Sequence, residues 1–377
     1  MNRLLGLELL RGVAATLVLL EHTRHSVWGI CGRDVELPWV IARFAGYWGV
    51  DVFFVLSGYL IGLTLSKPAV TPQSFLLARL ARILPLYLVA TSLCLMVPAM
   101  RSHAITTPIL VTTVTFLPLL GDALDPRTVH PFGWTLCYEM GFYLVATSLT
   151  AAVGGRRAVG AMIALFALAP LAFTAAGPVP GWAFPNFALS PMVIEFALGL
   201  LAYRLTDAIP RRAGWALLAL AAVGTAHGFA TNREIFGYHG FVIADPRLGL
   251  ARVTTWGLPA FACVLGTACL DRAGTFQPVA RLATAVGALS YSLYLVQPCS
   301  LAVTAILCIV AGVESPWPVA AATVAVTFAI AAFVARYVDL PLHALARRWV
   351  SGAISYPRPV LGGPAVALPL ALGSPPR

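Results

Sequence analysis

The stretch LLGLELLRGVAATLVLLEHTRH, residues 4–25, has the length and apolar character of a membrane-spanning helix. It nevertheless holds Arg11 and, eleven positions later, His22. A bilayer core about 30 Å thick is crossed by roughly 20 apolar residues, and an ionisable side chain inside such a span is costly. The stretch therefore predicts a transmembrane helix in which the charged groups have a structural or chemical role.

Arg11 and His22 lie on one face of this predicted helix. At 100° per residue, their spacing advances the helix only about 20° beyond three turns and separates the two residues by about 16 Å along the axis. Ionisable groups in spans usually face a bundle interior or a wet cavity, so we expect a guanidinium and an imidazole to enter one cavity at two depths. The alternative stays open that Arg11 snorkels or pairs with Glu8 while His22 and His25 cap the outer end.

The composition of the whole chain predicts a polytopic membrane protein. Of its 377 residues, 59% are apolar and only 11% are charged, and the mean hydropathy is +0.84, whereas about a quarter of the residues in soluble domains are charged. The net charge of +10 comes almost wholly from arginines between apolar runs, which favours orientation in a bilayer over nucleic-acid binding. The seven cysteines form no C-x-x-C pair and predict no metal site and no disulfide framework.

The apolar runs predict an all-α, polytopic transmembrane helix bundle with about ten membrane-spanning helices and both termini cytoplasmic. A further apolar stretch, 105–121, is short and Pro-flanked, as in a re-entrant segment. If it does not cross, most arginines collect on one side, as the positive-inside rule requires. We expect residues 1–348 to form one transmembrane domain and residues 349–377 to form a disordered cytoplasmic tail. The predicted spans are 5–25, 46–66, 83–100, 132–153, 158–176, 187–205, 213–230, 254–271, 285–310 and 318–338.

Two further stretches place polar side chains in or beside spans. In GYWGVDVFFVLSGYLIG, residues 46–62, Asp51 is expensive to bury without a nearby cation. Ser57 in the same stretch serves either close helix packing or a local opening near a ligand. In RLARILPLY, Arg79 and Arg82 are helical neighbours that can form a fork for a polyanion, although the positive-inside bias alone would also place arginines there.

Two later stretches complete the set of candidate polar sites. In PFGWTLCYEMGFYL, residues 131–144, Trp134 suits a membrane interface, whereas Glu139, about two turns inside a span, needs a partner or a chemical role. In ALSYSLYLVQP, residues 288–298, Tyr291 and its neighbours serve either the lining of a polar pathway or hydrogen bonding between helices.

In this order the stretches resemble the acyltransferase-3 family of integral membrane O-acyltransferases. LRGVAATLVLLEH is similar to the family's first motif, an arginine or lysine ahead of a histidine on the first helix. GVDVFFVLSGYLIG, the R-x-x-R of RLARILPLY and WTLCYEMGFY resemble its next blocks, the last in the form of exopolysaccharide acetyltransferases. YVDLPLHALARR resembles the closing block, with Asp339 ahead of the proline. Where the family often has a histidine after S-Y-S-L-Y-L-V, this chain has Gln297, so no second essential imidazole is expected there.

The resemblance implies an enzyme of the bacterial inner membrane that takes an acyl group, usually acetyl, from cytoplasmic acyl-coenzyme A, without a metal. The acceptor implied is a hydroxyl of a surface or exported polysaccharide or of its lipid-linked precursor, and the only other partner expected is membrane lipid. In the hypothesis for the site, Arg79 and Arg82 bind the coenzyme A phosphates, and Arg11 stabilises the thioester. It makes His22 the general base, with Glu139 orienting the imidazole or the sugar. The residues expected to line the cavity are Asp51, Ser57, Tyr59, Trp134 and Tyr291.

Three alternatives stay open. The acceptor can be a macrolide or another small secondary metabolite in place of a polysaccharide. The protein can be a glycolipid transporter or flippase, although the internal repeats common in transporters are not visible in the sequence. Within acyl transfer, a covalent acyl-histidine intermediate can replace direct transfer.

Overall fold

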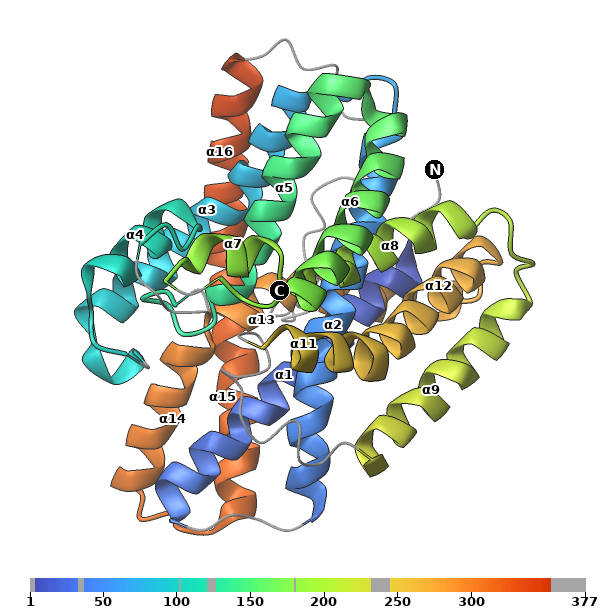
Figure 1. Cartoon of the computed structure of the whole chain (residues 1–377). Helices are drawn as coiled ribbons and strands as arrows, with labels where there is room; N and C mark the ends of the chain where they lie inside the picture. The colour runs from blue at the N-terminus through green and yellow to red at the C-terminus, as the bar shows by residue number, and fades with distance from the viewer. Residues whose placement is uncertain are drawn as a thin grey trace, which may run out of the picture.

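The computed structural model describes residues 4–32, 37–101, 103–120, 127–179, 181–231 and 245–353, and all regular elements within these ranges are helical (Figure 1), which confirms the all-α prediction. The helices are α1 (Leu5–Cys31), α2 (Leu37–Leu65), α3 (Pro72–Met96), α4 (Thr107–Thr115), α5 (Trp134–Val153), α6 (Gly155–Ala176), α7 (Ala183–Ala188), α8 (Ile194–Leu205), α9 (Ala213–Thr231), α11 (Pro246–Arg252), α12 (Leu258–Arg272), α13 (Ala280–Leu295), α14 (Gln297–Val310), α15 (Pro316–Val334) and α16 (Leu340–Ala353). Five short elements join them: the 3-10 turns η1 (Pro98–Met100), η2 (Pro191–Val193) and η5 (Gln277–Val279), and the π turns η4 (Val253–Gly257) and η6 (Ala335–Asp339).

Eight helical segments of the described chain are long and apolar enough to cross a membrane, or nine if the bent pair α13–α14 counts as one span. Helix α1 is long enough with 27 residues, but its ionisable side chains make it too polar to be counted with them. Helix α4 has nine residues and is about 14 Å long, which is too short to cross a core of about 30 Å. Ten spans with both termini cytoplasmic remain a prediction, in which α1 is the tenth span.

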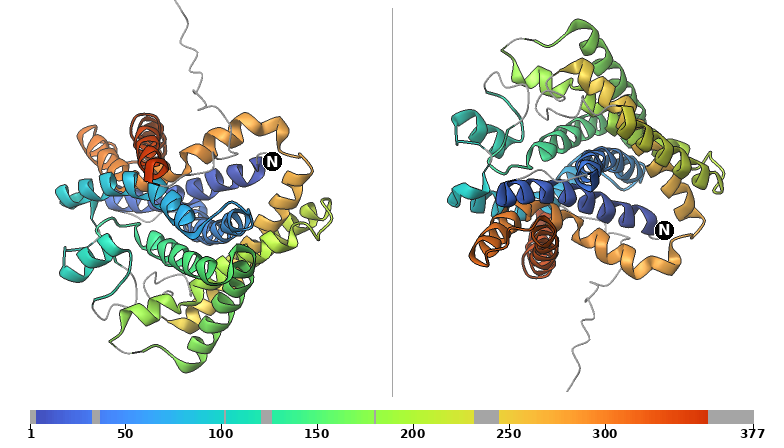
Figure 2. Two further views of the ribbon diagram at one scale, coloured as in Figure 1. Left: turned by 90° about the horizontal axis from the view of Figure 1, so that it is seen from above. Right: turned by 90° about the horizontal axis from the view of Figure 1, so that it is seen from below.

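Helices α1 and α2 run through the middle of the bundle in the views from above and below (Figure 2). Helix α1 packs mainly against α2 and α13, and α2 packs against α8. Glycines allow these close approaches: a Cβ atom on Gly49 would lie 2.8 Å from the Ala14 carbonyl oxygen, and one on Gly199 of α8 would overlap the Val55 carbonyl oxygen. Small residues at helix contacts are typical of membrane bundles, and Gly58 of α2 serves the same contact with α8.

The start of α1 is fixed by a residue from the end of α12. The carboxylate of Asp271 accepts hydrogen bonds from the backbone N–H groups of Gly6 at 2.6 Å and Leu7 at 3.1 Å. A carboxylate at this place satisfies first-turn donors and complements the helix dipole. These hydrogen bonds fix the position of α1 relative to α12, and with it the positions of Arg11 and His22 within the bundle.

The third span begins earlier than its predicted bounds of 83–100. Thr71 and Ser74 form a reciprocal capping box, and Pro72 occupies the first turn of α3. These are strong helix-start signals. Arg79 and Arg82 therefore belong to the helix itself and not to the preceding loop, and their side chains point from a rigid element.

The predicted span 285–310 is two helices, α13 and α14, bent by 74°. Pro298 lies in the first turn of α14. Proline has no N–H, its ring clashes with the carbonyl four residues earlier, and it disfavours helical backbone at the residue before it. The bend therefore falls at Val296 and places Gln297 at the start of a new helix.

Both π turns end directly before a Leu–Pro pair, Leu258–Pro259 and Leu340–Pro341. The missing proline N–H interrupts the α-helical ladder, and a widened turn accommodates it. Helix α11 precedes the first π turn, so residues 246–252, which lie between the predicted spans 213–230 and 254–271, are helical. After the second π turn, the last span continues into α16. Helix α16 reaches Ala353, so residues 349–353 of the predicted tail are helical, whereas residues 354–377 lie outside the described residues.

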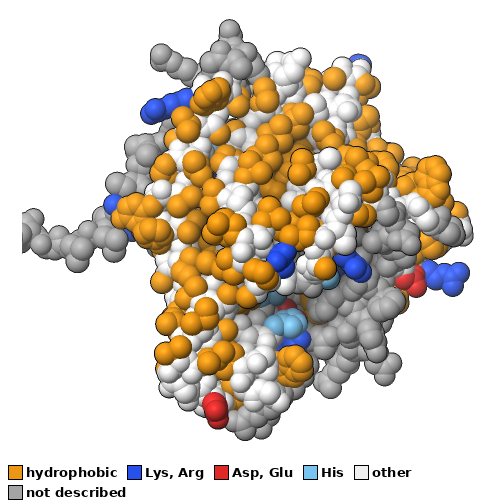
Figure 3. Space-filling view, turned by 90° about the vertical axis from the view of Figure 1, so that its left-hand side faces the viewer, with side chains coloured by type: hydrophobic (Ala, Val, Ile, Leu, Met, Phe, Trp, Pro, Cys, Tyr) orange, Lys and Arg blue, Asp and Glu red, His pale blue; other side chains and the backbone are white. Residues whose placement is uncertain are grey.

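The face on the left-hand side of Figure 1 shows the surface expected of a protein in lipid. Figure 3 shows it covered largely by hydrophobic side chains, with histidine, acidic and basic side chains together in a hollow. Exposed apolar side chains suit contact with lipid tails, and charged groups at membrane depth are expected in polar recesses.

Candidate active site

Two groups of polar side chains lie inside the bundle. We call the first the histidine cluster, which consists of His22, His130, Phe132, Tyr294 and Gln297. We call the second the arginine cluster, which consists of Arg11, Ser57, Arg79, Arg82, Glu139, Tyr143, Tyr291 and Asp339. Together they draw on all the stretches that the sequence singles out.

In the histidine cluster, the ring of His22 is held on two sides. Its Nδ1 atom contacts the side-chain oxygen of Gln297, and the ring of Phe132 stacks on it with centroids 3.9 Å apart and planes at 12°. Because an amide oxygen only accepts hydrogen bonds, Nδ1 carries the hydrogen and Nε2 keeps its lone pair. Gln297 is fully buried, whereas His22 is half-buried. This arrangement leaves Nε2 able to accept a proton.

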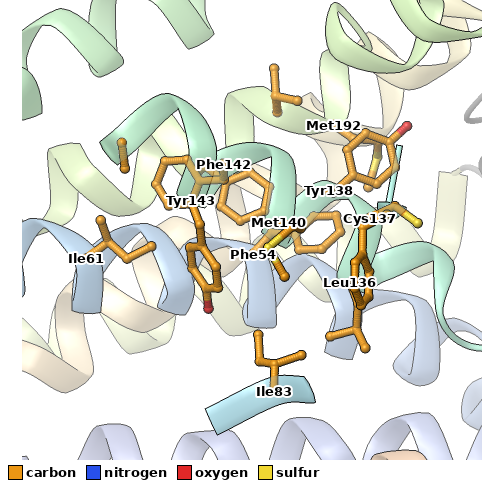
Figure 4. Close-up of a cluster of buried hydrophobic side chains, with 14 of the residues drawn as sticks. Phe54, Ile61, Ile83, Leu136, Cys137, Tyr138, Met140, Phe142, Tyr143 and Met192 are labelled. Atoms are coloured by element: carbon orange, nitrogen blue, oxygen red, sulfur yellow. The ribbon is translucent and has the colours of Figure 1, made fainter. Parts of the chain in front are cut away.

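In the arginine cluster, Glu139 is oriented by two hydroxyl groups. Its Oε1 atom accepts a hydrogen bond from the Ser57 hydroxyl at 3.0 Å and another from the Tyr143 hydroxyl. Figure 4 shows the Tyr143 hydroxyl pointing out of the surrounding apolar cluster, in a different direction from the hydroxyl of Tyr138. The two donors fix one carboxylate oxygen and leave the other available to a ligand.

Arg11 has no hydrogen bond or ion pair to any residue that the structure describes. The charged groups of Glu139, Arg79 and Arg82 are close enough to interact with its guanidinium electrostatically. A buried or half-buried cation without a direct partner is costly. This guanidinium is therefore a candidate to bind an anionic or carbonyl oxygen of a substrate.

Arg82 is already paired. Its Nη1 atom donates to both carboxylate oxygens of Asp339, at 2.8 and 2.9 Å, and its guanidinium lies 4.6 Å from the centroid of the Tyr291 ring. Ser292 donates a further hydrogen bond to Asp339 at 3.2 Å, and Tyr291 donates to the Ile83 carbonyl at 2.7 Å. Arg82 and Tyr291 therefore join α3, α13 and η6, with the charge of Arg82 largely balanced.

Arg79 differs from Arg82 because it meets no carboxylate among the described residues. Its Nη2 atom donates to the Thr64 hydroxyl at 3.3 Å, and its guanidinium lies 5.6 Å from the ring centroids of Phe75 and Tyr143. Its positive charge is thus available to a ligand. The two arginines of the R-x-x-R stretch do not form an equivalent fork.

An aromatic layer lies between the two clusters. Phe53 lies one helical turn before Ser57 on α2, and Thr135 lies one turn before Glu139 on α5. The Tyr294 hydroxyl bonds Thr135 at 2.8 Å, and its ring centroid lies 6.3 Å from that of Phe53 and 6.1 Å from that of Phe132. The clusters therefore occupy different depths, and the hydrogen-bond partner of the His22 imidazole is Gln297, while the partners of Glu139 are Ser57 and Tyr143.

Asp51 belongs to neither cluster. It is fully buried and pairs with Arg252, whose Nε atom donates to Oδ1 at 2.8 Å. Glu195 of α8 is also fully buried, and its carboxyl group lies close enough to Asp51 and Arg252 to interact with both electrostatically. Arg252 is the cation that Asp51 requires. It lies in α11, although the sequence assigns it to a loop.

Tyr59 and Trp134 also pack away from the two clusters. Tyr59 is buried edge-on against Tyr203 at 5.9 Å, on the opposite side of α2 from Ser57. Trp134 makes edge contacts with Phe54 at 6.4 Å and Tyr138 at 6.3 Å. Both side chains support the packing of helices around the site.

His130, Tyr143 and Glu195 are not among the site residues predicted from the sequence, although Tyr143 is one of the aromatic residues around Glu139 in its stretch. Tyr143 follows Glu139 by four residues, which is helical contact spacing, and Glu195 is a carboxylate in an apolar run, as Asp51 is. Both signals were available. His130 lies in a connecting segment, where spacing gives no such signal. The described residues hold no group of three His, Cys, Asp or Glu side chains placed to bind a metal ion.

The apolar helices indicate an integral membrane protein with an imidazole, a carboxylate and arginines inside its bundle, and the comparison of its sequence with known families decides its class. The profile of the acyltransferase domain of the acyltransferase-3 family matches residues 4–336, and the chain belongs to this family. The protein is therefore an acyltransferase, which confirms the resemblance and leaves the transporter alternative without support.

Two relatives are similar to the chain. It is 29% identical to the exopolysaccharide production protein ExoZ of Rhizobium meliloti (strain 1021) over 318 residues, which cover 81% of this chain and 92% of ExoZ. It is 35% identical to protein 2 in the picA locus of Rhizobium radiobacter over 96 residues, 24% of this chain and 44% of that protein. No solved structure matches the chain significantly.

Proposed function

We propose that the protein transfers an acetyl group from cytoplasmic acetyl-coenzyme A to a hydroxyl group of an exported polysaccharide or its lipid-linked precursor, in the bacterial inner membrane. Membership of the acyltransferase-3 family supports acyl transfer. Similarity to an exopolysaccharide production protein over most of both chains supports the polysaccharide acceptor. The observation that carries the proposal is the His22 imidazole, held by Gln297 and Phe132 with Nε2 free.

The acceptor side of the proposed site is the histidine cluster. Nε2 of His22 takes the proton of the acceptor hydroxyl as its oxygen attacks the thioester carbonyl, and the leaving thiolate then receives a proton from the imidazolium. Gln297 keeps the other ring nitrogen protonated throughout, so the base always presents the same atom. Glu139 lies in the arginine cluster, on the other side of the aromatic layer. Its second carboxylate oxygen would accept a hydrogen bond from a substrate there.

The donor side is the arginine cluster. Arg79, which has no carboxylate partner, and Arg11, which has no direct partner, would bind the phosphates and polar groups of coenzyme A. The charge of Arg82 is balanced by Asp339, so it would support the site more than bind the donor. The thioester arm would cross the aromatic layer to His22, over the roughly 16 Å that separate Arg11 and His22 along α1.

Arg79 and Arg82 should respond differently to substitution. Arg79→Ala should raise the KM for acetyl-coenzyme A by about 10- to 100-fold with little change in kcat, because a charge-assisted hydrogen bond contributes roughly 1.5–3 kcal/mol. Arg82→Ala should instead lower the unfolding temperature, because it leaves the buried Asp339 carboxylate without its cation. Steady-state kinetics and thermal unfolding of the purified protein would measure both effects.

Arg212→Ala is the matched control for these variants, since Arg212 is exposed in the turn before α9. It should change neither the KM nor the unfolding temperature. An unchanged KM in Arg79→Ala would mean that Arg79 serves only to orient the chain in the membrane.

The acetyl transfer itself is tested with purified full-length protein, radiolabelled acetyl-coenzyme A and polysaccharide from a strain that lacks the gene. Label should enter the polysaccharide as an alkali-labile ester. Polysaccharide from that strain should also lack O-acetyl signals in NMR spectra that the wild-type polymer shows. Identical O-acetyl content in the two polymers would contradict a polysaccharide acceptor and favour a small secondary metabolite.

A further inference from the structure

His130 is a fully buried histidine that the proposed chemistry does not use. It lies in the segment between α4 and α5, and its two ring nitrogens have different partners. Nε2 is 3.0 Å from the carbonyl oxygen of Leu295, and Nδ1 is 3.3 Å from the backbone nitrogen of Phe132. A carbonyl only accepts and a backbone N–H only donates, so Nε2 carries the hydrogen and Nδ1 accepts.

The first of these contacts lies at the bend between α13 and α14. Leu295 is the last residue of α13, and the last carbonyls of a helix have no helical donors of their own. His130 supplies a donor to the Leu295 carbonyl. It therefore stabilises the backbone at the bend, two residues before Gln297.

The second contact reaches the other side of the His22 ring. The N–H of Phe132 bonds to His130, and its carbonyl accepts a hydrogen bond from the Tyr294 hydroxyl at 3.0 Å. The backbone of Phe132 is thus held at both ends, while its ring stacks on His22. Both residues that contact His22, Phe132 and Gln297, are consequently placed relative to the bend that His130 supports.

We propose that His130 is a positioning residue for the acyl transfer, which holds Phe132 and the α13–α14 bend so that the His22 ring keeps one orientation. The proposal needs His130 to be neutral, because a protonated Nδ1 cannot accept the Phe132 hydrogen bond. Burial lowers the pKa of His130 to about 4, so it is neutral at pH 7. This inference rests on the proposed role of His22.

Three variants separate the two contacts of His130. His130→Ala removes both, His130→Asn keeps a side-chain acceptor near the position of Nδ1, and His130→Gln keeps a donor near the position of Nε2. We expect His130→Ala to lower kcat by about 100-fold, the cost of a small misplacement of a catalytic group, without a change in the KM for acetyl-coenzyme A. His130→Asn should retain a higher kcat than His130→Gln, even if His130→Ala does not fold, because the acceptor holds Phe132, whose ring stacks directly on His22, whereas the donor reaches His22 only through Leu295 and the bend.

The control is His103→Ala, which replaces an exposed histidine near the start of α4 and should leave kcat unchanged. Wild-type kcat in His130→Ala, or a kcat in His130→Gln equal to or above that of His130→Asn, would overturn the proposal. A purely structural role would lower the unfolding temperature of both variants without separating their kcat values.

A second measurement does not depend on enzymatic activity. The rate at which diethyl pyrocarbonate modifies His22 can be followed by mass spectrometry of the peptide in the full-length protein. Loss of the stacked, hydrogen-bonded orientation should make this modification several times faster in His130→Ala or His130→Gln than in the wild type. An unchanged rate would overturn the positioning role, whereas a faster rate in a protein that transfers no acetyl group would contradict the proposed function alone.

Discussion

His22→Ala should abolish acetyl transfer while the protein still inserts into the membrane and folds. A general base contributes about 10²- to 10⁴-fold to a rate, and the His22 imidazole is the one that bonds to Gln297 and stacks on the Phe132 ring among the described residues. The initial rate of label transfer from acetyl-coenzyme A measures the loss. His25→Ala is the matched control, because His25 is exposed one turn further along α1, and it should keep most of the activity.

The same variant distinguishes direct transfer from a covalent intermediate. We expect wild-type protein mixed with radiolabelled acetyl-coenzyme A, without acceptor, to retain no label after denaturation. Label that is retained by the wild type and lost in His22→Ala would show an acyl-histidine and contradict direct transfer. Full activity in His22→Ala would remove His22 from the chemistry altogether.

Arg252→Met should be the most destabilising of the substitutions considered. It leaves the carboxylates of Asp51 and Glu195 fully buried without the guanidinium that pairs with Asp51 at 2.8 Å. Removal of one partner from a buried ion pair costs about 3–5 kcal/mol, which corresponds to a decrease in Tm of roughly 4–6 °C for a chain of this length. Thermal unfolding of the full-length protein in detergent measures the change.

Arg247→Ala is the control for this experiment, since Arg247 is an exposed residue of the same helix, α11. A second test adds Asp51→Asn to Arg252→Met, which removes the unpaired charge and should recover part of the lost stability. A Tm of Arg252→Met equal to that of the wild type would show that the buried pair contributes nothing net to the fold.

The class of fold follows from the sequence because apolar runs of sufficient length leave few alternatives to membrane helices. Helix boundaries follow less well where a local signal acts against hydropathy. Thr71 and Pro72 start α3 well before its most apolar part, and Pro298 bends a run that hydropathy alone reads as one span. These signals are local and could have been used.

The pairing of side chains across the bundle depends on tertiary contacts that local patterns do not contain. His22 meets Gln297 across 275 positions of the chain, and Asp51 meets Arg252 across 201. Arg252 falls outside the predicted span 254–271, yet its pairing with a buried carboxylate allows it inside the bundle. The cost of an ionisable group at membrane depth marks Arg11, Glu139 and His22 in the sequence, and the family resemblance implies their roles, but their separation into two clusters appears only in three dimensions.

The aromatic layer of Phe53 and Tyr294 has a consequence for the membrane as a whole. An inner membrane stores energy as a proton gradient, and a continuous file of water between the two clusters would dissipate it. The rings of Phe53 and Tyr294, which lie between the clusters, would interrupt such a file. Under the proposed function, the thioester arm would have to pass between these rings, and the layer would then let an acetyl group cross while limiting the leak of protons.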